Sequence, residues 1–575
     1  MGSKQIPVEN VAQGFLELLR ERGIEVFLAN AGTDFASIVD GFAKFRAEGK
    51  TTPRPMLVPH EFVAVSMAHG YHLASGKMAA VMVHTTVGTA NAAGGIINAT
   101  RARIPLLFLA GRNPITEEGL PGARNIYIHW AQEAFDQGGM LREYMKWEYE
   151  LRNAVQLEAV VDRALEQAMT PPQGPVHLML PREVLAQPLR EITVTSPARR
   201  KVPAHLHPDP AGIEEAARIL VKARFPLILT TSVGQDPAAV PALVALAEAG
   251  AIGVLDVYQS TVNFPGDHHC YLGTAPGRGN SPHLTEADVI LVIESEVPWV
   301  PLLSKPREDA RIIHLGVDPL YSRYPIRSFP CDLALPAHPS AALPLLTEAI
   351  RRNLWGHKSA VERRRRWLRE QSQARRRAVR AQAEASGGKI PISFRWASAC
   401  LDQVKDEGTV IVNEYPLAFD QMTFTRPGSY FGNPPSGGLG WGLGAALGVK
   451  LARPEKTVIA AVGDGSYLFG VPTSAHFAAR AHDLPFLTII FNNEQWEAVK
   501  TASLSVHPQG WGASTGHFPL VDLTPSPRFE EIVRAFDGYG ERVEDPAEFL
   551  PAVRRGLQAV KEGRQAVLNV IARRP

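Results

Sequence analysis

Short apolar runs alternate with helical patterns along most of the chain. Between residues 26 and 109 the runs VFLAN, AAVMVH and PLLFLAG are separated by HEFVAVSMAHGYHLASG and by a pattern around NAAGGIINATRA, both typical of helices. Strands that alternate with helices predict a parallel sheet in which each helix is a crossover. This segment ends near PVHLMLPREV, where a proline and an arginine stop the strand pattern.

Two more segments repeat this alternation. The second contains FPLILTT, AIGVLDV, ADVILVIES and ARIIHLGVD, and the third contains GTVIVNE, TVIAAVGDG, LPFLTIIFNN and QAVLNVIA. Polar, proline-containing sequence from about Leu189 to Pro210 predicts a linker after the first segment, and arginine-rich sequence at 363–377 precedes the third. We therefore predict an α/β protein with three domains at 1–188, 189–350 and 389–575, and a basic helical linker at 351–388.

Composition narrows the class of protein. The chain has 575 residues, 45% of them hydrophobic and 21% charged, which suits a globular protein of several domains. Sixty Lys and Arg against 58 Asp and Glu leave a formal charge of +2, which gives no reason to expect a nucleic-acid or membrane partner. We interpret the arginine-rich stretch as the solvated face of a linking helix.

The absence of three sequence features predicts the location of the protein in the cell. Its first residues are typical of an amphipathic helix and not of a signal peptide, and no run approaches the roughly 18 apolar residues that a membrane span needs. Cys270, Cys331 and Cys400 lie far apart and form no disulfide or metal spacing. These features predict a soluble, cytoplasmic protein in a reducing compartment.

Two polar clusters each follow a strand of the third segment. TVIAAV runs into Gly463-Asp464-Gly465, and FLTIIF runs into Asn492-Asn493. The 26 residues between these clusters leave room for one helical crossover. Because the carboxyl ends of parallel strands lie at one edge of a sheet, we expect Asp464 and Asn493 to converge.

A carboxylate and an amide carbonyl form a sparse ligand set made only of oxygens. Such a set suits Mg²⁺, which completes an octahedral shell with phosphate oxygens and water. The glycines let the backbone approach a diphosphate closely, and the start of the following helix favours its negative charge. A GDG turn alone is common, but its pairing with NN at this spacing favours a metal-diphosphate site.

With these two motifs the sequence resembles the thiamine-diphosphate-dependent enzyme family, whose signature is GDG followed by NN. The resemblance extends over nearly the whole chain and implies a pyrimidine-binding, a central Rossmann-like and a diphosphate-binding domain. It implies thiamine diphosphate and Mg²⁺ as cofactors, with the metal held by Asp464, the Asn493 side chain and the backbone carbonyl of Gln495. It further assigns Gly463, Gly465 and Ser466 to cofactor binding.

Two more motifs match this family. Glu61, in HEFVAVSMAHGY, stands where the family has a glutamate from the partner subunit that activates the aminopyrimidine ring. In SGGLGWG, Gly437 and Leu439 stand where a carbonyl accepts a hydrogen bond from the cofactor and where an apolar residue supports its bent shape. A first-turn helix glutamate and close helix packing at glycines are the alternatives. The resemblance implies a homodimer at least, and homotetramers are common in the family.

The remaining motifs concern the reaction. His84, 23 residues after Glu61, and Thr33 match positions of benzoylformate decarboxylases that transfer protons and contact the substrate carboxylate. A second histidine of those enzymes, from the central domain, does not carry over, because the matching stretch is EVPWVP. Gln132, in AQE, resembles a glutamine near the cofactor of acetolactate synthases. A histidine bonded to backbone and a surface glutamine are the alternatives.

These resemblances predict a 2-oxoacid decarboxylase or carboligase, similar to acetolactate synthases, that acts on small 2-oxoacids or aldehydes. A cofactor carbanion would add to the substrate carbonyl, CO₂ would leave, and the enamine would be protonated or would attack a second carbonyl. A flavin-dependent oxidase on the same scaffold and a non-catalytic relative are the rivals. FAD is not favoured, because the flavin segment of acetolactate synthases is not evident around IESEVPWVP.

Two other features have a plainer interpretation. Residues 267–270, Asp-His-His-Cys, look metal-like in isolation but lack a second ligand cluster, so we interpret them as polar loop residues. Trp299, Trp441 and Trp496 would either shape a pocket that accepts aromatic groups or pack in the core.

Overall fold

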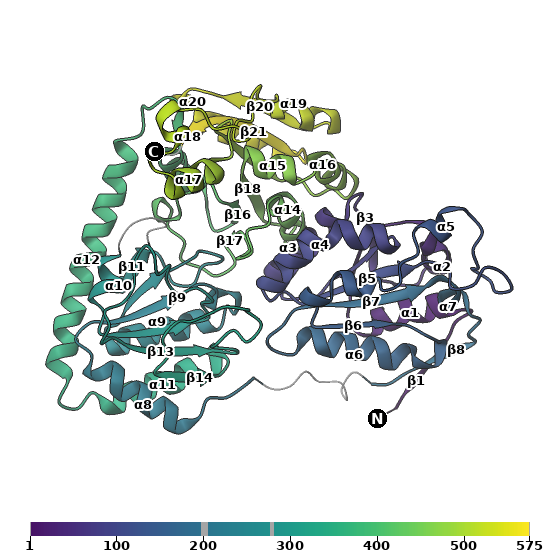
Figure 1. Cartoon of the computed structure of the whole chain (residues 1–575), viewed down its shortest axis with the longest axis horizontal. Coiled ribbons are helices and arrows are strands. Elements are labelled where there is room, and N and C mark those ends of the chain that lie inside the picture. Colours follow the sequence, from purple (N-terminus) through teal and green to yellow (C-terminus); the bar gives the residue numbers. More distant parts are fainter. Residues whose placement is uncertain (1, 197–204, 276–280, 574–575) are drawn as a thin grey trace. The chain divides into compact units, whose positions relative to one another are not determined.

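A computed structural model describes residues 2–196, 205–275 and 281–573, which fall into two compact units. The first unit combines Met1–Pro203, Asn433–Arg542 and Arg555–Val570, and the second combines Ala204–Gly432, Val543–Arg554 and Ile571–Pro575. Helices alternate with mainly parallel strands in both units (Figure 1), which confirms the predicted α/β class.

The first unit contains a six-stranded parallel sheet in the order β3-β2-β4-β5-β7-β6. Its strands are Val26–Asn30 (β2), Arg54–Leu57 (β3), Ala80–Val83 (β4), Leu106–Arg112 (β5), Trp147–Glu150 (β6) and Pro175–Pro181 (β7). Every residue of β4 and β7 is buried, as their continuous apolar runs require. Because β3 and β4 lie on opposite sides of β2, a topological switch point lies at the carboxyl ends of β2 and β4.

Helices connect these strands and cover the sheet. They are Val11–Glu21 (α1), Ala36–Ala47 (α2), Glu61–Ser75 (α3), Thr85–Arg101 (α4), Ile128–Ala131 (α5), Leu157–Met169 (α6) and Arg182–Ala186 (α7). Helix α3 begins after His60, whose side chain accepts a hydrogen bond from the Phe62 amide, and ends at Gly76, which has a φ of 71°. The predicted helix therefore starts at Glu61, the candidate catalytic residue.

The two ends of the first segment differ from the prediction. A strand, Lys4–Pro7 (β1), precedes α1 and pairs antiparallel with Glu191–Val194 (β8). The expected linker is wrong over β8, where alternation buries Ile192 and Val194 against the core. Residues 197–204 of that linker lie outside the described residues.

Later segments add further helices and strands, most of them in the first unit. Trp441–Ala452 (α14) leads to Thr457–Gly463 (β18), Asp464–Phe469 (α15), Pro472–Ala481 (α16) and Leu487–Asn492 (β19). β18 and β19 pair in parallel, as the GDG and NN spacing predicts. The chain continues with Glu497–Val506 (α17), Trp511–Thr515 (α18), Phe529–Ile532 (α19), Tyr539–Val543 (β20), Pro546–Lys561 (α20) and Ala566–Arg573 (β21).

The second unit contains the central sheet, six parallel strands in the order β11-β10-β9-β12-β13-β14. The strands are Pro226–Thr230 (β9), Gly253–Asp256 (β10), Tyr271–Thr274 (β11), Val289–Ile293 (β12), Arg311–Gly316 (β13) and Leu333–Pro336 (β14). Its helices are Pro210–Lys222 (α8), Ala239–Gly250 (α9), Pro282–Glu286 (α10), Pro339–Asn353 (α11), Lys358–Glu384 (α12) and Phe394–Val404 (α13). Ile392–Ser393 (β15), Thr409–Glu414 (β16) and Tyr430–Gly432 (β17) follow, with β16 parallel to β17.

The predicted basic linker forms the long helix α12, which runs beside the central sheet (Figure 1). Its arginines are not all solvated, which corrects the interpretation from sequence. Arg364 is buried and donates hydrogen bonds to the carbonyls of Ala223 (2.6 Å) and Gly250 (2.7 Å), at the carboxyl ends of α8 and α9. The guanidinium therefore satisfies helix-end carbonyls of two other helices. Within the described ranges, none of the helices is both long and apolar enough to cross a membrane.

Replacing Arg364 with Met should destabilise the second unit. The substitution leaves buried carbonyls without donors, which costs about 2–3 kcal/mol of unfolding free energy. Denaturant unfolding of purified Arg364→Met measures this loss, with Arg366→Gln as the control because Arg366 is exposed on the same helix. Equal loss in both variants, or none in either, would contradict the capping role.

Candidate active site

The switch point of the first sheet brings together two polar side chains. Asp34 follows β2, His84 follows β4, and the His84 Nδ1 lies 2.5 Å from the Asp34 Oδ1. Asp34 is buried, with its side chain 2% exposed, whereas the His84 side chain is 16% exposed. The Nδ1 of the ring is therefore bound inside the protein, and the side chain of Gln132 also bonds to the ring.

The surroundings of His84 favour its charged form. The hydrogen bond from His84 to the Asp34 carboxylate raises the pKa of His84, against the opposing effect of burial, and Gln132 and Glu61 add to the rise. His84 is therefore bonded through its side chain to a carboxylate and not only to backbone, and its charged form is favoured.

Two glycines make this close pairing possible. A Cβ on Gly32 would lie 2.1 Å from the His84 Nδ1, and one on Gly111 would lie 1.5 Å from the Asp34 Oδ2. Neither position therefore admits a side chain unless the histidine or the aspartate moves.

Glu61, the first residue of α3, is buried with a 4% exposed side chain. Its two carboxylate oxygens accept hydrogen bonds from the side-chain amides of Asn30 (2.9 Å) and Asn91 (3.2 Å). Asn30 ends β2, so the same strand end positions both Glu61 and the Asp34–His84 pair. Two amide donors hold the carboxylate in one orientation.

One face of α4 runs along the candidate site. His84, Gly88, Asn91 and Asn98 recur at helical spacing, and Gly88 leaves space beside Glu61. Asn98 donates from its amide to the Gly438 carbonyl (3.0 Å), while its Oδ1 accepts from the Gly438 amide (3.1 Å). This reciprocal pair fixes the glycine-rich loop against α4.

Helices α3 and α14 pack with their backbones in direct contact. A Cβ on Gly444 would lie 2.5 Å from the Ser66 Cβ, and one on Gly448, a turn later, would lie 1.9 Å from the Met67 carbonyl oxygen. Contacts that advance together along both helices mean that the helices run in the same direction. Their amino ends therefore coincide, so Glu61 and the loop containing Gly437 and Leu439 lie at the same end of the pair.

The GDG and NN motifs converge as predicted. The side-chain amide of Asn493 lies 3.2 Å from the Asp464 Oδ1 and 2.9 Å from the Gln495 carbonyl oxygen, and its nitrogen can donate a hydrogen bond to both. Turning the amide by 180° would instead present its oxygen to a metal ion. The Asp464 Oδ2 is buried and has no hydrogen-bond partner within the described ranges. These three residues thus offer an oxygen ligand set of the kind that Mg²⁺ prefers.

Burial raises the pKa of Asp464 to about 6, although nearby backbone amides oppose the shift. A buried carboxylate without a counter-charge has this property, and a cation would remove the cost. Gly463 and Gly465 flank Asp464, Ser466 is buried one turn into α15, and a Cβ on Gly465 would lie 2.2 Å from the Trp496 ring.

The two asparagines of the NN motif have different surroundings. Asn492 is fully buried and donates to the side chains of Ser526 (2.8 Å) and Asn569 (3.0 Å). It therefore holds neighbouring segments together, while Asn493 faces Asp464 and Gln495.

The other predicted residues lie near His84. The backbone carbonyl of Gln132 accepts a hydrogen bond from the Thr86 hydroxyl (2.9 Å), and its side-chain Oε1 is buried without a well-aligned partner among the described residues. Thr33 is exposed, and its Oγ1 lies 3.3 Å from the Nε2 of His129, which is buried. The structure thus gathers Thr33, His84 and Gln132 into one site with Glu61.

Sequence reasoning missed Asn30, Asp34, Asn91 and His129. A signal existed for the first three, since Asn30 and Asp34 flank the end of a strand and Asn91 lies seven residues after His84 on one helix face. No local pattern marks His129, because it reaches the site from a separate segment.

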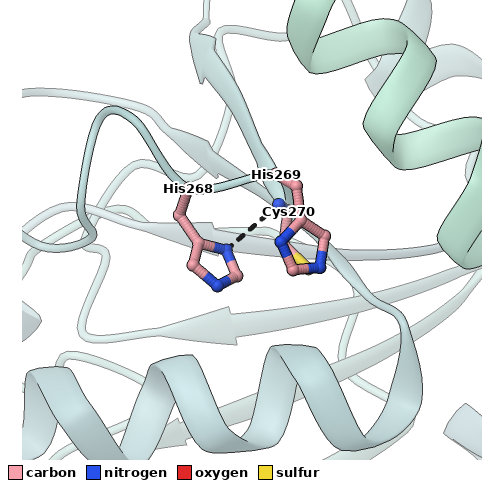
Figure 2. Close-up of side chains that lie close together, drawn as sticks. All are labelled: His268, His269 and Cys270. Atoms are coloured by element: carbon pink, nitrogen blue, oxygen red, sulfur yellow. Dashed lines mark hydrogen bonds between the residues drawn. The ribbon is translucent and has the colours of Figure 1, made fainter.

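The cluster of His268, His269 and Cys270 in the second unit has the expected plain interpretation (Figure 2). Their potential ligand atoms lie within 4.8 Å of one another. The His268 Nδ1 already accepts a hydrogen bond from the Cys270 amide, and its Nε2 lies 3.1 Å from Glu248. Burial also raises the pKa of the Cys270 thiol to about 12, which disfavours the thiolate that binds metals.

Of the three tryptophans, Trp441 and Trp299 pack in the core. Trp441 is fully buried against His69, and Trp299 is buried edge-on to Phe329. Trp496 is half-buried beside Phe469 and Gly465. Only Trp496 therefore lies at the candidate site.

Gly111→Ala tests the packing around the Asp34–His84 pair. The added methyl group would overlap the Asp34 carboxylate, and such overpacking costs about 1–3 kcal/mol of unfolding free energy. Denaturant unfolding measures the change, with Gly388→Ala as the control because a Cβ there meets nothing within 4 Å. Wild-type stability of Gly111→Ala would show that the pair is not closely confined.

Three family models match the chain. The N-terminal thiamine pyrophosphate (TPP) binding domain of thiamine pyrophosphate enzymes matches residues 9–140, the central domain matches residues 213–335, and the C-terminal TPP binding domain matches residues 414–570. The matched ranges include Glu61 and His84 in the first model and Asp464 and Asn493 in the third.

Curated relatives cover most of the chain. Benzoylformate decarboxylase of Pseudomonas aeruginosa is 28% identical over 505 residues, covering 86% of this chain and 88% of that protein. A probable acetolactate synthase of Mycobacterium bovis is 27% identical over 589 residues, covering 99% and 97%. The structure of 4-hydroxybenzoylformate decarboxylase from Rhodococcus jostii RHA1 has a TM-score of 0.77 at 24% identity, over 98% of this chain and 99% of that one, which shows the same fold.

The motifs, the parallel sheets and the three matched domains agree with one another, and the predicted resemblance is confirmed. This chain belongs to the family of thiamine-diphosphate-dependent enzymes.

Proposed function

We propose that this protein is a Mg²⁺-dependent 2-oxoacid decarboxylase or carboligase, similar to acetolactate synthases in its donor chemistry. The observation that carries the proposal is the Asp34–His84 pair, 2.5 Å apart, beside the carboxylate of Glu61. A decarboxylase needs a proton donor close to the reacting carbon, and His84 is held by Asp34, which raises the pKa of His84.

The residues present fit thiamine diphosphate and Mg²⁺. Asp464, the side chain of Asn493 and the carbonyl of Gln495 would hold the metal, because the three groups converge and the buried Asp464 Oδ2 has no hydrogen-bond partner among the described residues. Glu61 would bond a pyrimidine nitrogen, held for that purpose by two asparagine amides. When bound, the cofactor supplies a nucleophilic carbon and an electron sink that permits loss of CO₂.

The chain's own residues would then act on the substrate. His84 would donate a proton from Nε2, since Nδ1 is committed to Asp34. Thr33 is exposed at the same strand end and would bind the substrate carboxylate through its hydroxyl. Gln132, whose buried Oε1 lacks a well-aligned partner among the described residues, would bind the acceptor or a proton-bearing product group.

The relatives support this range of reactions without fixing one. They include proteins named as a decarboxylase, as acetolactate synthases and as sulfoacetaldehyde acetyltransferases, the last from Rhodobacter capsulatus at 25% identity over 517 residues. These names share thiamine-dependent chemistry at a carbonyl carbon but differ in the acceptor. The identity of the acceptor substrate is therefore left to experiment.

Product analysis tests the proposal directly. Purified protein is loaded with thiamine diphosphate and Mg²⁺ and given pyruvate or benzoylformate, and CO₂, aldehydes and hydroxyketones are measured. A hydroxyketone identifies a carboligase, and aldehyde with CO₂ identifies a decarboxylase. Flavin absorption with oxidised product would support an oxidase instead, and binding without turnover of either acid would refute the proposed substrate class.

Asp464→Asn should weaken cofactor binding. The substitution removes the negative ligand, and loss of even an outer partner of a metal typically costs about 10- to 100-fold in affinity. Mg²⁺-dependent binding of thiamine diphosphate, measured by calorimetry, should fall at least about 100-fold. Asp483→Asn is the control, because Asp483 is exposed in the same unit. Unchanged affinity of Asp464→Asn would remove Asp464 from the metal site.

We also propose a homodimer at least, with Glu61 and Asp464 acting on one cofactor from different subunits. Glu61→Gln and Asp464→Asn proteins, each inactive, would then recover activity when they are mixed and reassembled. About a quarter of the wild-type activity is expected, since half of the random dimers are mixed and each has one intact site. No recovery, despite mixed dimers seen by native mass spectrometry, would place both residues in one subunit.

Domain boundaries and location remain part of the proposal. The three matched models lie inside the predicted domains 1–188, 189–350 and 389–575, which supports these limits. We propose a cytoplasmic location on the basis of the cysteine pattern alone.

A further inference from the structure

We propose that His129 adds a second histidine to the site, with a role different from that of His84, the proton donor of the proposed function. His129 is a positioning residue that directs the Thr33 hydroxyl toward an anionic group of the substrate. The roles rest on the proposed function, whereas the contacts and ionisation states on which they depend can be measured without it.

Adjacent residues contact the two rings. Thr33 and Asp34 begin the short 3-10 helix Thr33–Phe35 at the carboxyl end of β2. The Thr33 Oγ1 lies 3.3 Å from the His129 Nε2, and the Asp34 Oδ1 lies 2.5 Å from the His84 Nδ1. One strand end therefore fixes both histidines, although they come from segments 45 residues apart in the sequence.

The hydrogen bonds of His129 define its tautomer. Its Nδ1 accepts a hydrogen bond from the Asn125 backbone amide at 3.3 Å, so that nitrogen carries no proton. The proton of the neutral ring must then lie on Nε2, which donates to the Thr33 Oγ1. Since the Thr33 oxygen is already an acceptor, its own hydrogen is free to point outward, toward an anion. This is the orientation that binding of a carboxylate requires.

The pKa values of the two histidines are shifted in opposite directions. The Asp34 carboxylate raises the pKa of His84, with smaller contributions from Gln132 and Glu61. Burial lowers the pKa of His129, and the positive charges of Arg182, Arg124 and His84 lower it further, against the opposing charge of Asp34. Titratable groups whose surroundings move their pKa values apart are typical of acid–base sites.

The sign of each shift fixes the pH behaviour. The charged form of His84 is favoured to higher pH than in an ordinary histidine and is lost as the pH rises through the raised pKa. The neutral form of His129 is favoured to lower pH than in an ordinary histidine. There is therefore a pH range in which His84 is charged while His129 is neutral.

His129 is also relevant to a histidine of related enzymes that has no counterpart in this sequence. The matching histidine in the central domain of benzoylformate decarboxylases does not carry over to EVPWVP in this chain. His129, on α5 of the first unit, supplies a buried imidazole beside Thr33 instead.

Deuterium exchange at the imidazole C2 carbon, followed by peptide mass spectrometry across pH, measures the pKa of each histidine. In the wild-type protein we expect the pKa of His84 above 6.5 and that of His129 below it. Asp34→Asn should lower the pKa of His84 and leave His129 below 6.5. Asp40→Asn, at an exposed position on α2, should change neither. An unshifted His84 in Asp34→Asn, or a His129 pKa above 6.5 in the wild type, would overturn the inference.

Steady-state kinetics on whichever acid is turned over tests the role of His129. His129→Leu should raise KM by about three- to tenfold, the usual effect of one lost hydrogen bond, with a smaller change in kcat. His129→Gln, whose amide can donate to Thr33, should restore most of the loss. Thr33→Val and the double variant Thr33→Val/His129→Leu should have similar KM values, because both residues act through one hydroxyl.

His207→Ala is the matched control, because His207 is exposed in the second unit. Additive effects of the Thr33 and His129 substitutions, or failure of His129→Gln to restore binding, would overturn the positioning role. If no 2-oxoacid is turned over while both pKa values are as expected, the proposed function fails and the two ionisation states stand. If turnover occurs and the pKa values are not separated, only this inference fails.

Discussion

Direct backbone packing between α3 and α14 is the constraint on which the candidate site depends. Glycines at 444 and 448 let α14 approach Ser66 and Met67 with no side chain between them, and the helices run in the same direction. Their amino ends therefore meet, which places Glu61 beside the loop of Gly437 and Leu439. A bulky residue in this contact would displace the first turns of both helices, and with them Glu61 and the glycine-rich loop, although it would touch neither.

Polar residues at the carboxyl ends of parallel strands form the rest of the candidate site. Polar residues after β2 and β4 converge at a switch point, and those after β18 and β19 converge around Asp464. A carboxylate is buried at both places, but its surroundings differ. Asp34 is paired with a histidine and raises the pKa of that ring, whereas Asp464 has no paired cation, and burial raises its own pKa to about 6. Under the proposed function, the first place would provide a proton donor and the second a cation site.

Much of this could be predicted from the sequence, because the apolar runs are long and the GDG and NN motifs follow directly from them. The strands, the crossover between Asp464 and Asn493, and the helix that begins at Glu61 were all predictable for that reason. The strand Glu191–Val194 was not, since four alternating residues in a proline-containing stretch resemble a linker. The burial of Arg364 and the contact of His129 with Thr33 depend on tertiary packing, which local patterns do not encode.

We propose that Glu61 and the Asp464 cluster, contributed by different subunits of a dimer, serve one thiamine diphosphate. An experimental structure of the protein with thiamine diphosphate and Mg²⁺ tests this most directly. We expect a pyrimidine nitrogen within about 3 Å of the Glu61 carboxylate and a metal ion bound by Asp464, Asn493 and the Gln495 carbonyl. A cofactor whose metal lies elsewhere, or whose pyrimidine ring is beyond hydrogen-bond reach of Glu61, would contradict it.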